Sequence, residues 1–153
     1  MSDVPILNQA KASWGLDAAE HAFDVAQIEA RTNPQDAFAW FNMGTSLTEL
    51  GRYDEAAIAY DRAAAGGLPW RMLWYQFGLF EAFYEVGRYD DVLNQVNANL
   101  ANGGEYVEEV YYWQGRALAA QGRTSEAINA FQNALRHNPL FTLAQDALNE
   151  LSS

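Results

Sequence analysis

Apolar residues recur with the spacing of a helix face over residues 37–70. The first stripe has an i, i+3, i+4, i+7 pattern and consists of Trp40, Met43, Gly44 and Leu47. Gly51 stands where this helix should end, because glycine readily adopts the left-handed conformation found just past a helix. A second helix is expected from Asp54, taken as its N-cap, to Gly66. Its apolar face consists of Ala56, Tyr60 and Ala63.

Residues 108–141 repeat this plan. The apolar face of the first predicted helix consists of Tyr111, Gly115 and Leu118. Gly122 ends that helix, and the face of the second consists of Ala127, Phe131 and Ala134. In both segments a glycine on one helix is expected to oppose an alanine on the next, Gly44 with Ala56 and Gly115 with Ala127. Such small pairs let two antiparallel helices approach closely.

A short motif marks the same turn three times. It reads Gly51-Arg52-Tyr53-Asp54, then Gly87-Arg88-Tyr89-Asp90, then Gly122-Arg123-Thr124. The three glycines are spaced 36 and 35 residues apart. A period of this length is typical of stacked helical repeats, which usually work as binding surfaces.

The middle copy, residues 71–107, departs from the pattern and can be aligned in two ways. Anchoring on Gly78 buries Trp74, Phe77, Gly78 and Glu81, whereas anchoring on Gly87 buries Gln76, Leu79, Phe80 and Phe83. We prefer the second alignment, because a buried amide is cheaper to satisfy than a buried carboxylate. It puts Phe80 and Val92 where the other copies have Gly and Ala, which predicts a wider helix pair. The first helix is expected from about Pro69 to Val86.

Weaker helical patterns precede and follow these copies. Asp17 and Glu20 have the spacing of a capping box, which predicts a helix from there to Thr32 and a short partner helix over residues 4–14. After Pro139 an amphipathic helix is expected to cover the exposed end of the array. Its apolar stripe consists of Leu140, Leu143, Ala144, Ala147, Leu148 and Leu151.

Composition narrows the classes of function. The chain has 153 residues, no Cys, two His and a formal net charge of −11. Neither a nucleophile–base constellation nor a phosphate or calcium loop is visible, so we expect no enzyme activity, metal or cofactor. The negative charge disfavours nucleic acid. No apolar run approaches the roughly 20 residues of a membrane span, and the N-terminus does not read as a signal peptide. A cytoplasmic location is expected if the chain is full-length.

The two regular copies resemble the tetratricopeptide repeat family. The matching positions are Trp40-Gly44-Ala56-Tyr60-Ala63 and Tyr111-Gly115-Ala127-Phe131-Ala134-Pro139. The resemblance implies an all-α fold, a right-handed α-solenoid of antiparallel helix pairs with a C-terminal capping helix. The chain would then be one repeat domain, divided into a degenerate unit (3–36), a repeat (37–70), a degenerate repeat (71–107), a repeat (108–141) and a capping helix (142–151).

In this family the first helix of each pair lines a concave groove. The resemblance therefore implies that a peptide or partner binds at Phe41, Asn42, Thr45, Trp74, Phe77, Glu81, Tyr84, Tyr112, Trp113 and Arg116. Aromatic faces attract apolar and cationic groups, and the groove carboxylates reject acidic ones. The expected partner is thus a protein or peptide that is apolar and neutral to basic. The competing interpretation is that several of these aromatic side chains pack against the next repeat or a missing domain.

A second resemblance covers less of the chain. It rests on the stretch Gly67-Leu68-Pro69-Trp70-Arg71-Met72-Leu73-Trp74-Tyr75-Gln76-Phe77-Gly78, followed by Gly87-Arg88-Tyr89-Asp90-Asp91-Val92. These segments look like the repeat region that follows the protease domain of some bacterial cysteine peptidases, those of the bacteriocin-leader-peptidase-like class. This resemblance implies a non-catalytic accessory domain of a larger enzyme. A third hypothesis is a structural module that associates with itself as a homo-oligomer.

Overall fold

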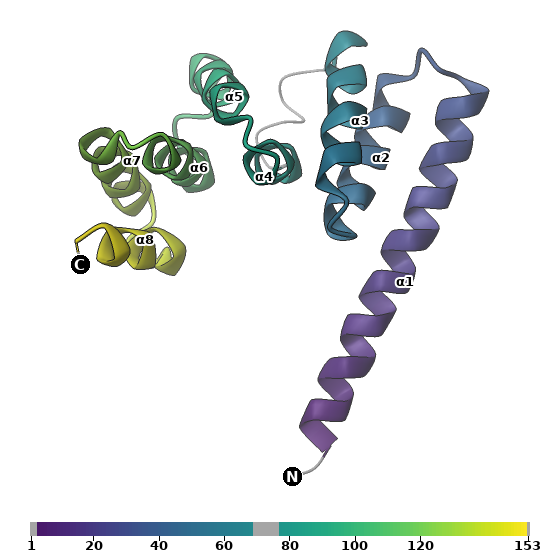
Figure 1. Ribbon diagram of the computed structural model, residues 1–153, viewed down its shortest axis with the longest axis horizontal. Coiled ribbons are helices and arrows are strands. Elements are labelled where there is room, and N and C mark those ends of the chain that lie inside the picture. The colour runs from purple at the N-terminus through teal and green to yellow at the C-terminus, as the bar shows by residue number, and fades with distance from the viewer. Residues whose placement is uncertain (1–2, 69–76, 153) are drawn as a thin grey trace. The chain divides into compact units, whose positions relative to one another are not determined.

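The computed structural model describes the backbone of residues 3–68 and 77–152, and the side chains of these ranges from Gly15 onward except Leu16. Within the described residues the chain forms eight α-helices and no strands (Figure 1). The helices belong to two compact units, Met1–Leu68 and Pro69–Ser153. The all-α class expected from the sequence is confirmed.

Unit 1 consists of α1 (Asp3–Thr32), α2 (Ala37–Glu49) and α3 (Tyr53–Ala65), and α2 contacts both of its neighbours. Helix α1 buries the small residues Ala19, Ala26 and Ala30. The rings of Phe41 on α2 and Tyr60 on α3 meet edge to face with their centroids 5.4 Å apart. Small residues on α1 and an aromatic pair between α2 and α3 therefore make the core of this unit.

The expected break near Asp17 is wrong. Helix α1 runs without interruption from Asp3 to Thr32, and its N-terminal half extends beyond the ends of α2 and α3 (Figure 1). Asp17 and Glu20 lie inside the helix with exposed side chains, so they form no capping box and residues 4–14 form no separate partner helix. Gly15 meets no other group within 4 Å of a built Cβ, so nothing at this point forces the helix to end. The predicted end at Thr32, before Asn33-Pro34, is confirmed.

Unit 2 contains α4 (Gly78–Glu85), α5 (Tyr89–Ala101), α6 (Glu108–Ala120), α7 (Thr124–His137) and α8 (Thr142–Ser152). Each helix contacts the next one along the chain, and α6 also contacts α4 and α8. Its buried side chains include Phe80, Val92, Val96, Val110 and Phe131. Helices α4, α6 and α8 thus lie next to one another, and α5 and α7, which connect them, pack against them.

The middle copy follows the alignment anchored on Gly87. Leu79, Phe80 and Phe83 are buried in α4, whereas Glu81 is only half-buried, and Gln76 lies outside the described residues. The expected length of the helix is wrong, because Phe77 is the N-cap and α4 begins at Gly78. The rest of the predicted segment, residues 69–76, lies outside the described residues. Phe80 and Val92 are both buried, as the alignment requires, and the wider spacing of this helix pair stays a prediction.

The repeated Gly-Arg motif has a clear structural basis. Gly51, Gly87 and Gly122 have φ values of 75°, 80° and 77°, the left-handed conformation in which a side chain would be strained. The amide of the following arginine then donates to a carbonyl five residues back, as Arg52 does to Leu47. This turn leads straight into the next helix, so α3 begins at Tyr53 with Arg52 as N-cap. Asp54 lies in its first turn, and the expected capping role for Asp54 is wrong.

Gly44 and Gly115 allow close approach of the paired helices, as predicted, but each faces an aromatic ring instead of the predicted alanine. A Cβ built on Gly44 would lie 2.8 Å from ring atoms of Tyr60, and one built on Gly115 would lie 2.6 Å from the ring of Phe131. The glycines therefore accommodate the aromatic ring of the second helix. Ala56 and Ala127, each fully buried, belong to the same packed helix pairs.

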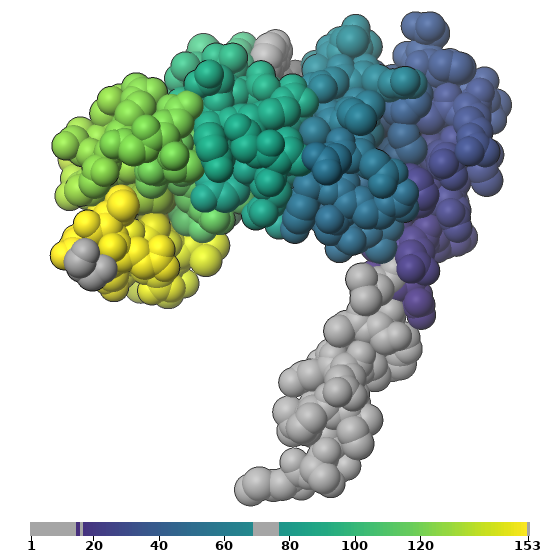
Figure 2. Space-filling model, viewed as in Figure 1, coloured from purple at the N-terminus to yellow at the C-terminus, as the bar shows by residue number. Residues whose placement is uncertain are grey.

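The apolar stripe expected on the last helix is only partly buried. Ala144 is fully buried and Phe141 packs on Tyr112 with ring centroids 5.6 Å apart. Leu140 and Leu143, in contrast, are 86% and 52% exposed. Helix α8, yellow at the surface of unit 2 in Figure 2, therefore contacts α7 through a narrower face than the sequence pattern predicts.

Candidate functional site

The ten predicted binding residues are divided between the two units. Phe41, Asn42 and Thr45 lie on α2 of unit 1, and Trp74 lies outside the described residues. The other six lie in unit 2, where they are Phe77, Glu81, Tyr84, Tyr112, Trp113 and Arg116. The residues of each unit are therefore described separately.

Unit 1 has an open groove between α1 and α2, with a volume of about 440 Å³. We call it the α1–α2 groove, and it is lined by His21, Ala22, Val25, Ala26, Glu29, Asn42, Thr45, Ser46 and Glu49. Its two helices contribute in different ways. Helix α1 supplies most of the apolar floor, including Val25, whose side chain is 42% exposed. The carboxylates of Glu29 and Glu49 are exposed, one on each helix.

Two of the three predicted residues in unit 1 line this groove. Asn42 is exposed and Thr45 is half-buried, with its hydroxyl 3.2 Å from the Tyr60 hydroxyl. Phe41 lies instead in the core, 3% exposed and packed on Tyr60. Phe41 is next to Asn42 in sequence, but the side chains of consecutive residues on a helix point about 100° apart. The two residues therefore face different surroundings. Phe41 does not line the groove.

The sequence analysis missed the contribution of α1 to this groove. His21, Val25 and Glu29 recur every four residues, which is a helical spacing. The sequence analysis assigned this stretch to a degenerate unit and named none of its residues as binding residues. Burial in fact falls on Ala19, Ala26 and Ala30, which leaves the neighbouring stripe open. The alanine spacing is the signal that could have distinguished the two faces.

In unit 2 an arginine and several aromatic rings form one cluster. The Arg116 guanidinium carbon lies 4.2 Å from the Tyr84 ring centroid and 5.3 Å from that of Trp113. Its Nη1 also donates to the Tyr112 hydroxyl at 3.3 Å. Tyr84 contacts both Trp113 and Tyr89, with centroids 5.9 and 5.4 Å apart. The structure thus brings together four of the predicted residues from α4 and α6, which are the first helices of successive repeats. They are Tyr84, Tyr112, Trp113 and Arg116.

This cluster already contains its own cation. Partial burial disfavours the charge on Arg116, but the hydroxyl groups of Tyr84 and Tyr112 outweigh it and raise the pKa of Arg116. The guanidinium therefore remains charged while it occupies the tyrosine face that a partner's cation would otherwise take. Trp113 and Tyr112 are buried, so an approaching partner meets mainly Arg116 and Tyr84.

The remaining predicted residues of unit 2 lie on α4. Phe77 and Glu81 are both half-buried, and the Phe77 ring stacks on Phe80 with centroids 6.3 Å apart. Phe77 thus continues the buried aromatic packing of its own helix pair. On α6, Glu109 is half-buried, and burial raises the pKa of its carboxyl above the usual value.

Metal chemistry and membrane insertion find no support in the described residues. In the part of the chain with described side chains, no group of three or more His, Cys, Asp or Glu residues could hold a metal ion. None of the described helices is long and apolar enough to cross a membrane.

Helix pairs joined by short turns and stacked in sequence define the class of α-solenoid repeat proteins. Residues 37–65 and 108–141 match the family model described as "Tetratricopeptide repeat". These two segments are therefore tetratricopeptide repeats, as the spacing of their glycines, alanines and aromatic residues predicted. The family model leaves residues 66–107 unmatched, and this stretch includes the copy that departs from the pattern.

A solved structure described as "MamA RS-1 ArsTM double mutant" has a similar fold. Its TM-score is 0.76 with 21% sequence identity, over 95% of this chain and 82% of that one. At this identity the likeness concerns the fold alone. A search of curated proteins found no match. These comparisons give no support to the likeness with peptidase repeat regions, and residues 69–76 of the segments that carry it lie outside the described residues.

Tetratricopeptide repeats typically form protein-interaction modules, and the two matched repeats support this general role for the chain.

Proposed function

We propose that the α1–α2 groove binds a partner protein through an extended or helical segment that is apolar and neutral to basic. The observation that carries the proposal is the composition of the groove, where Glu29 and Glu49 flank a floor that includes Val25. No arginine or lysine is among its lining residues. A cation on the partner would meet a carboxylate on either helix, and an apolar side chain would cover the exposed part of Val25.

Size and polarity support a peptide segment as the ligand. A volume of about 440 Å³ is large enough for a few side chains, and the groove is open rather than enclosed. The amide of Asn42 and the hydroxyl of Thr45 can hydrogen-bond a peptide backbone. A flexible segment loses conformational freedom when it docks, so we expect micromolar affinity.

The Arg116 cluster takes a different part in this proposal. Because Arg116 covers the face of Tyr84, this surface does not select a basic partner. It suits an apolar side chain that packs on Tyr84 or an oxygen acceptor that bonds Arg116. The preference for a basic segment therefore rests on unit 1. Trp113→Ala would remove a buried ring and lower stability, so it is a poor probe of binding.

The test is a peptide selection on the whole protein, followed by titration of the selected sequences against variants. Val25→Ser should weaken binding by about 1 kcal/mol, the value of the apolar surface that a ligand would cover. Glu49→Gln should cost about 0.2–1 kcal/mol, and the loss should shrink at high salt because the ion pair is exposed.

Matched controls separate these losses from indirect effects. Ile28→Ser removes an exposed apolar side chain from the same helix outside the groove, and Asp54→Asn removes an exposed carboxylate from α3. Both controls should bind like the parent protein. The proposal is refuted if the selected peptides are acidic, or if the controls lose as much affinity as Val25→Ser and Glu49→Gln.

A further inference from the structure

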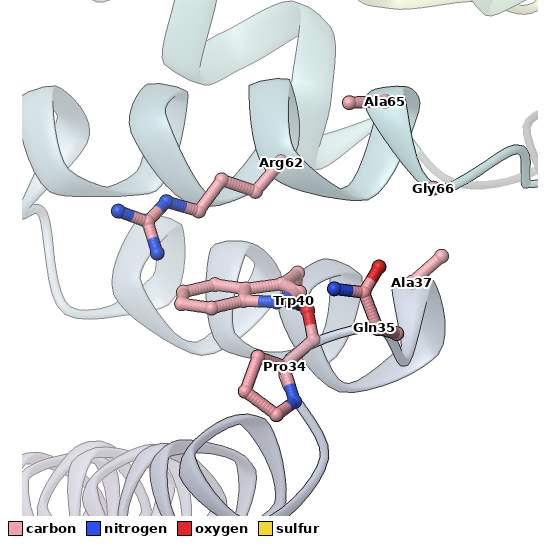
Figure 3. A pocket seen from close by; sticks show the side chains of 7 residues that line it. All are labelled: Pro34, Gln35, Ala37, Trp40, Arg62, Ala65 and Gly66. Carbon is pink, nitrogen blue, oxygen red and sulfur yellow. Dashed lines mark hydrogen bonds between the residues drawn. The ribbon is translucent and has the colours of Figure 1, made fainter.

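Unit 1 has a second cleft that the proposed function does not use. Two cavities of about 230 and 270 Å³ share Trp40 and Arg62, and together we call them the Trp40 cleft. The Arg62 guanidinium carbon lies 4.5 Å from the Trp40 ring centroid, between the cavities. The smaller cavity, with Pro34 and Gln35 on its near side, is drawn in Figure 3. The indole Nε1 of Trp40 donates to the Pro34 carbonyl at 2.9 Å and holds the ring in place.

The Trp40 cleft and the α1–α2 groove lie on opposite flanks of α2. The groove is lined on this helix by Asn42, Thr45 and Glu49, and the cleft by Trp40, Met43 and Leu47. With about 100° of turn per residue, these two sets point in directions well over 90° apart. A molecule in one site therefore leaves the other accessible.

The larger cavity is apolar, and its only uncompensated charge is positive. Phe23, Met43, Leu47 and the 57% exposed Ile58 line it together with Trp40. Glu55 also reaches this cavity, but its carboxylate is paired with Arg52 at 2.6 Å. No ion pair joins Arg62 to a carboxylate among the described residues. The cleft therefore favours an apolar side chain next to a carboxylate, and its volume suits one or two side chains rather than a small-molecule ligand.

Helix α8 presents that combination on its exposed side. Leu143 is 52% exposed, although the sequence pattern places it on an apolar stripe, and Leu140, which precedes the helix, is 86% exposed. Asp146 is exposed as well, and it lies three residues after Leu143, so the two side chains are neighbours on the helix surface. A leucine and a carboxylate are thus displayed side by side.

We propose that α8 of one copy of the chain docks into the Trp40 cleft of a second copy. Leu143 occupies the apolar cavity beneath Ile58 and Asp146 pairs with Arg62. The contact joins two different surfaces, so successive copies assemble head to tail into a ring or an open chain. The net charge of −11 makes copies repel one another at long range, so the association is weak and depends on protein concentration.

The experiment measures the oligomeric state of the full chain by sedimentation velocity over a concentration series up to the millimolar range. Arg62→Glu and Asp146→Arg should each raise the dissociation constant roughly tenfold or more, because each places like charges opposite one another. The double variant Arg62→Glu with Asp146→Arg should recover most of the association. Rescue by the double variant excludes misfolding as the cause of the two losses.

Two further measurements locate the contact. The indole N–H resonance of Trp40 should shift with protein concentration, and Leu143→Ser should suppress the shift. Glu49→Gln, which alters the α1–α2 groove, should leave the association unchanged, so this proposal and the proposed function can fail separately. A protein that stays monomeric throughout, or charge-reversal variants that the double change does not rescue, would overturn the proposal. So would an acidic partner peptide that fills the cleft of a protein without self-association.

Discussion

Gly115 provides the sharpest test of the helix packing. Replacing it with alanine adds one methyl group, whose carbon would lie 2.6, 2.7 and 2.8 Å from three ring atoms of Phe131. These distances are too short for van der Waals contact, so the ring or the helix must move. Phe131 is buried in the core of unit 2, and its rigid ring has little room to move.

Two effects of opposite sign decide the magnitude. Overpacking a well-packed core typically costs about 1–3 kcal/mol. Replacing glycine by alanine inside a helix gains about 1 kcal/mol from helix propensity. Because three ring atoms are involved at once, we place the cost in the upper half of its range. The expected result for Gly115→Ala is a net loss of about 1–2 kcal/mol, or roughly 2–8 °C in melting temperature.

Gly15→Ala is the matched control. Gly15 also lies inside a helix, and a Cβ built on it meets nothing within 4 Å. The same substitution should there stabilise the protein by up to about 1 kcal/mol. Chemical denaturation compares both variants with the parent protein, and hydrogen exchange of the α6 amides shows whether the loss occurs in unit 2.

A double-mutant cycle isolates the contact. Phe131→Leu removes the crowding ring atoms, so its combination with Gly115→Ala should be less destabilised than the sum of the two single variants, by at least about 0.5 kcal/mol. If Gly115→Ala stabilises as much as Gly15→Ala, or if the cycle shows simple additivity, close approach of α6 and α7 at this point is not what the glycine provides.

Three other predictions concern unit 2. Ala144→Leu should lower the free energy of unfolding by about 1–3 kcal/mol in chemical denaturation, because residue 144 is fully buried. Leu143→Ser should change it by less than about 0.5 kcal/mol, because Leu143 is exposed. Equal losses would contradict the observed buried face of α8. Burial raises the pKa of Glu109, so the folded state binds its proton more tightly and stability falls as pH rises from about 4.5 through that raised value. Glu109→Gln should therefore stabilise the protein at neutral pH and not at acidic pH, in melting curves across the range, and an advantage that persists in acid would have another cause. Arg116→Met should lower stability by about 0.5–2 kcal/mol and change the absorption of the tyrosines it covers, and a variant as stable as the parent would show that the guanidinium contacts contribute nothing.

Much of the fold could be read from local patterns. The glycines at 51, 87 and 122 predicted where helices end, because only glycine adopts the left-handed turn at low cost. The small positions also predicted close approach of the paired helices, although Gly44 and Gly115 face the rings of Tyr60 and Phe131 rather than the predicted alanines. The alignment anchored on Gly87 agrees with the burial of Leu79, Phe80 and Phe83, and Glu81 remains half-exposed, as the cost of burying a carboxylate favours.

The failures share a physical cause. Asp17 and Glu20 have the spacing of a helix start. A capping side chain acts only at a helix end, however, and α1 continues through both residues. Leu143 has the spacing of a core residue, yet burial requires a neighbour within reach, and on α8 only Ala144 is fully buried among the described side chains. Phe41 was predicted to bind a partner and instead fills the space beside Tyr60.

The sequence by itself determined the periodic features of this protein, namely the helix pairs, their turns, the small-residue contacts and the repeat family. Those features depend on interactions between residues close together in the chain, so local spacing suffices to predict them. Only the tertiary structure decided which aromatic faces remain available, since Arg116 occupies the face of Tyr84 across a distance of 32 residues in sequence. It also decided that α1 opens a groove on one flank of α2 while Trp40 and Arg62 form a cleft on the other. Both depend on how three helices meet, and a one-dimensional pattern records only which residues share a face.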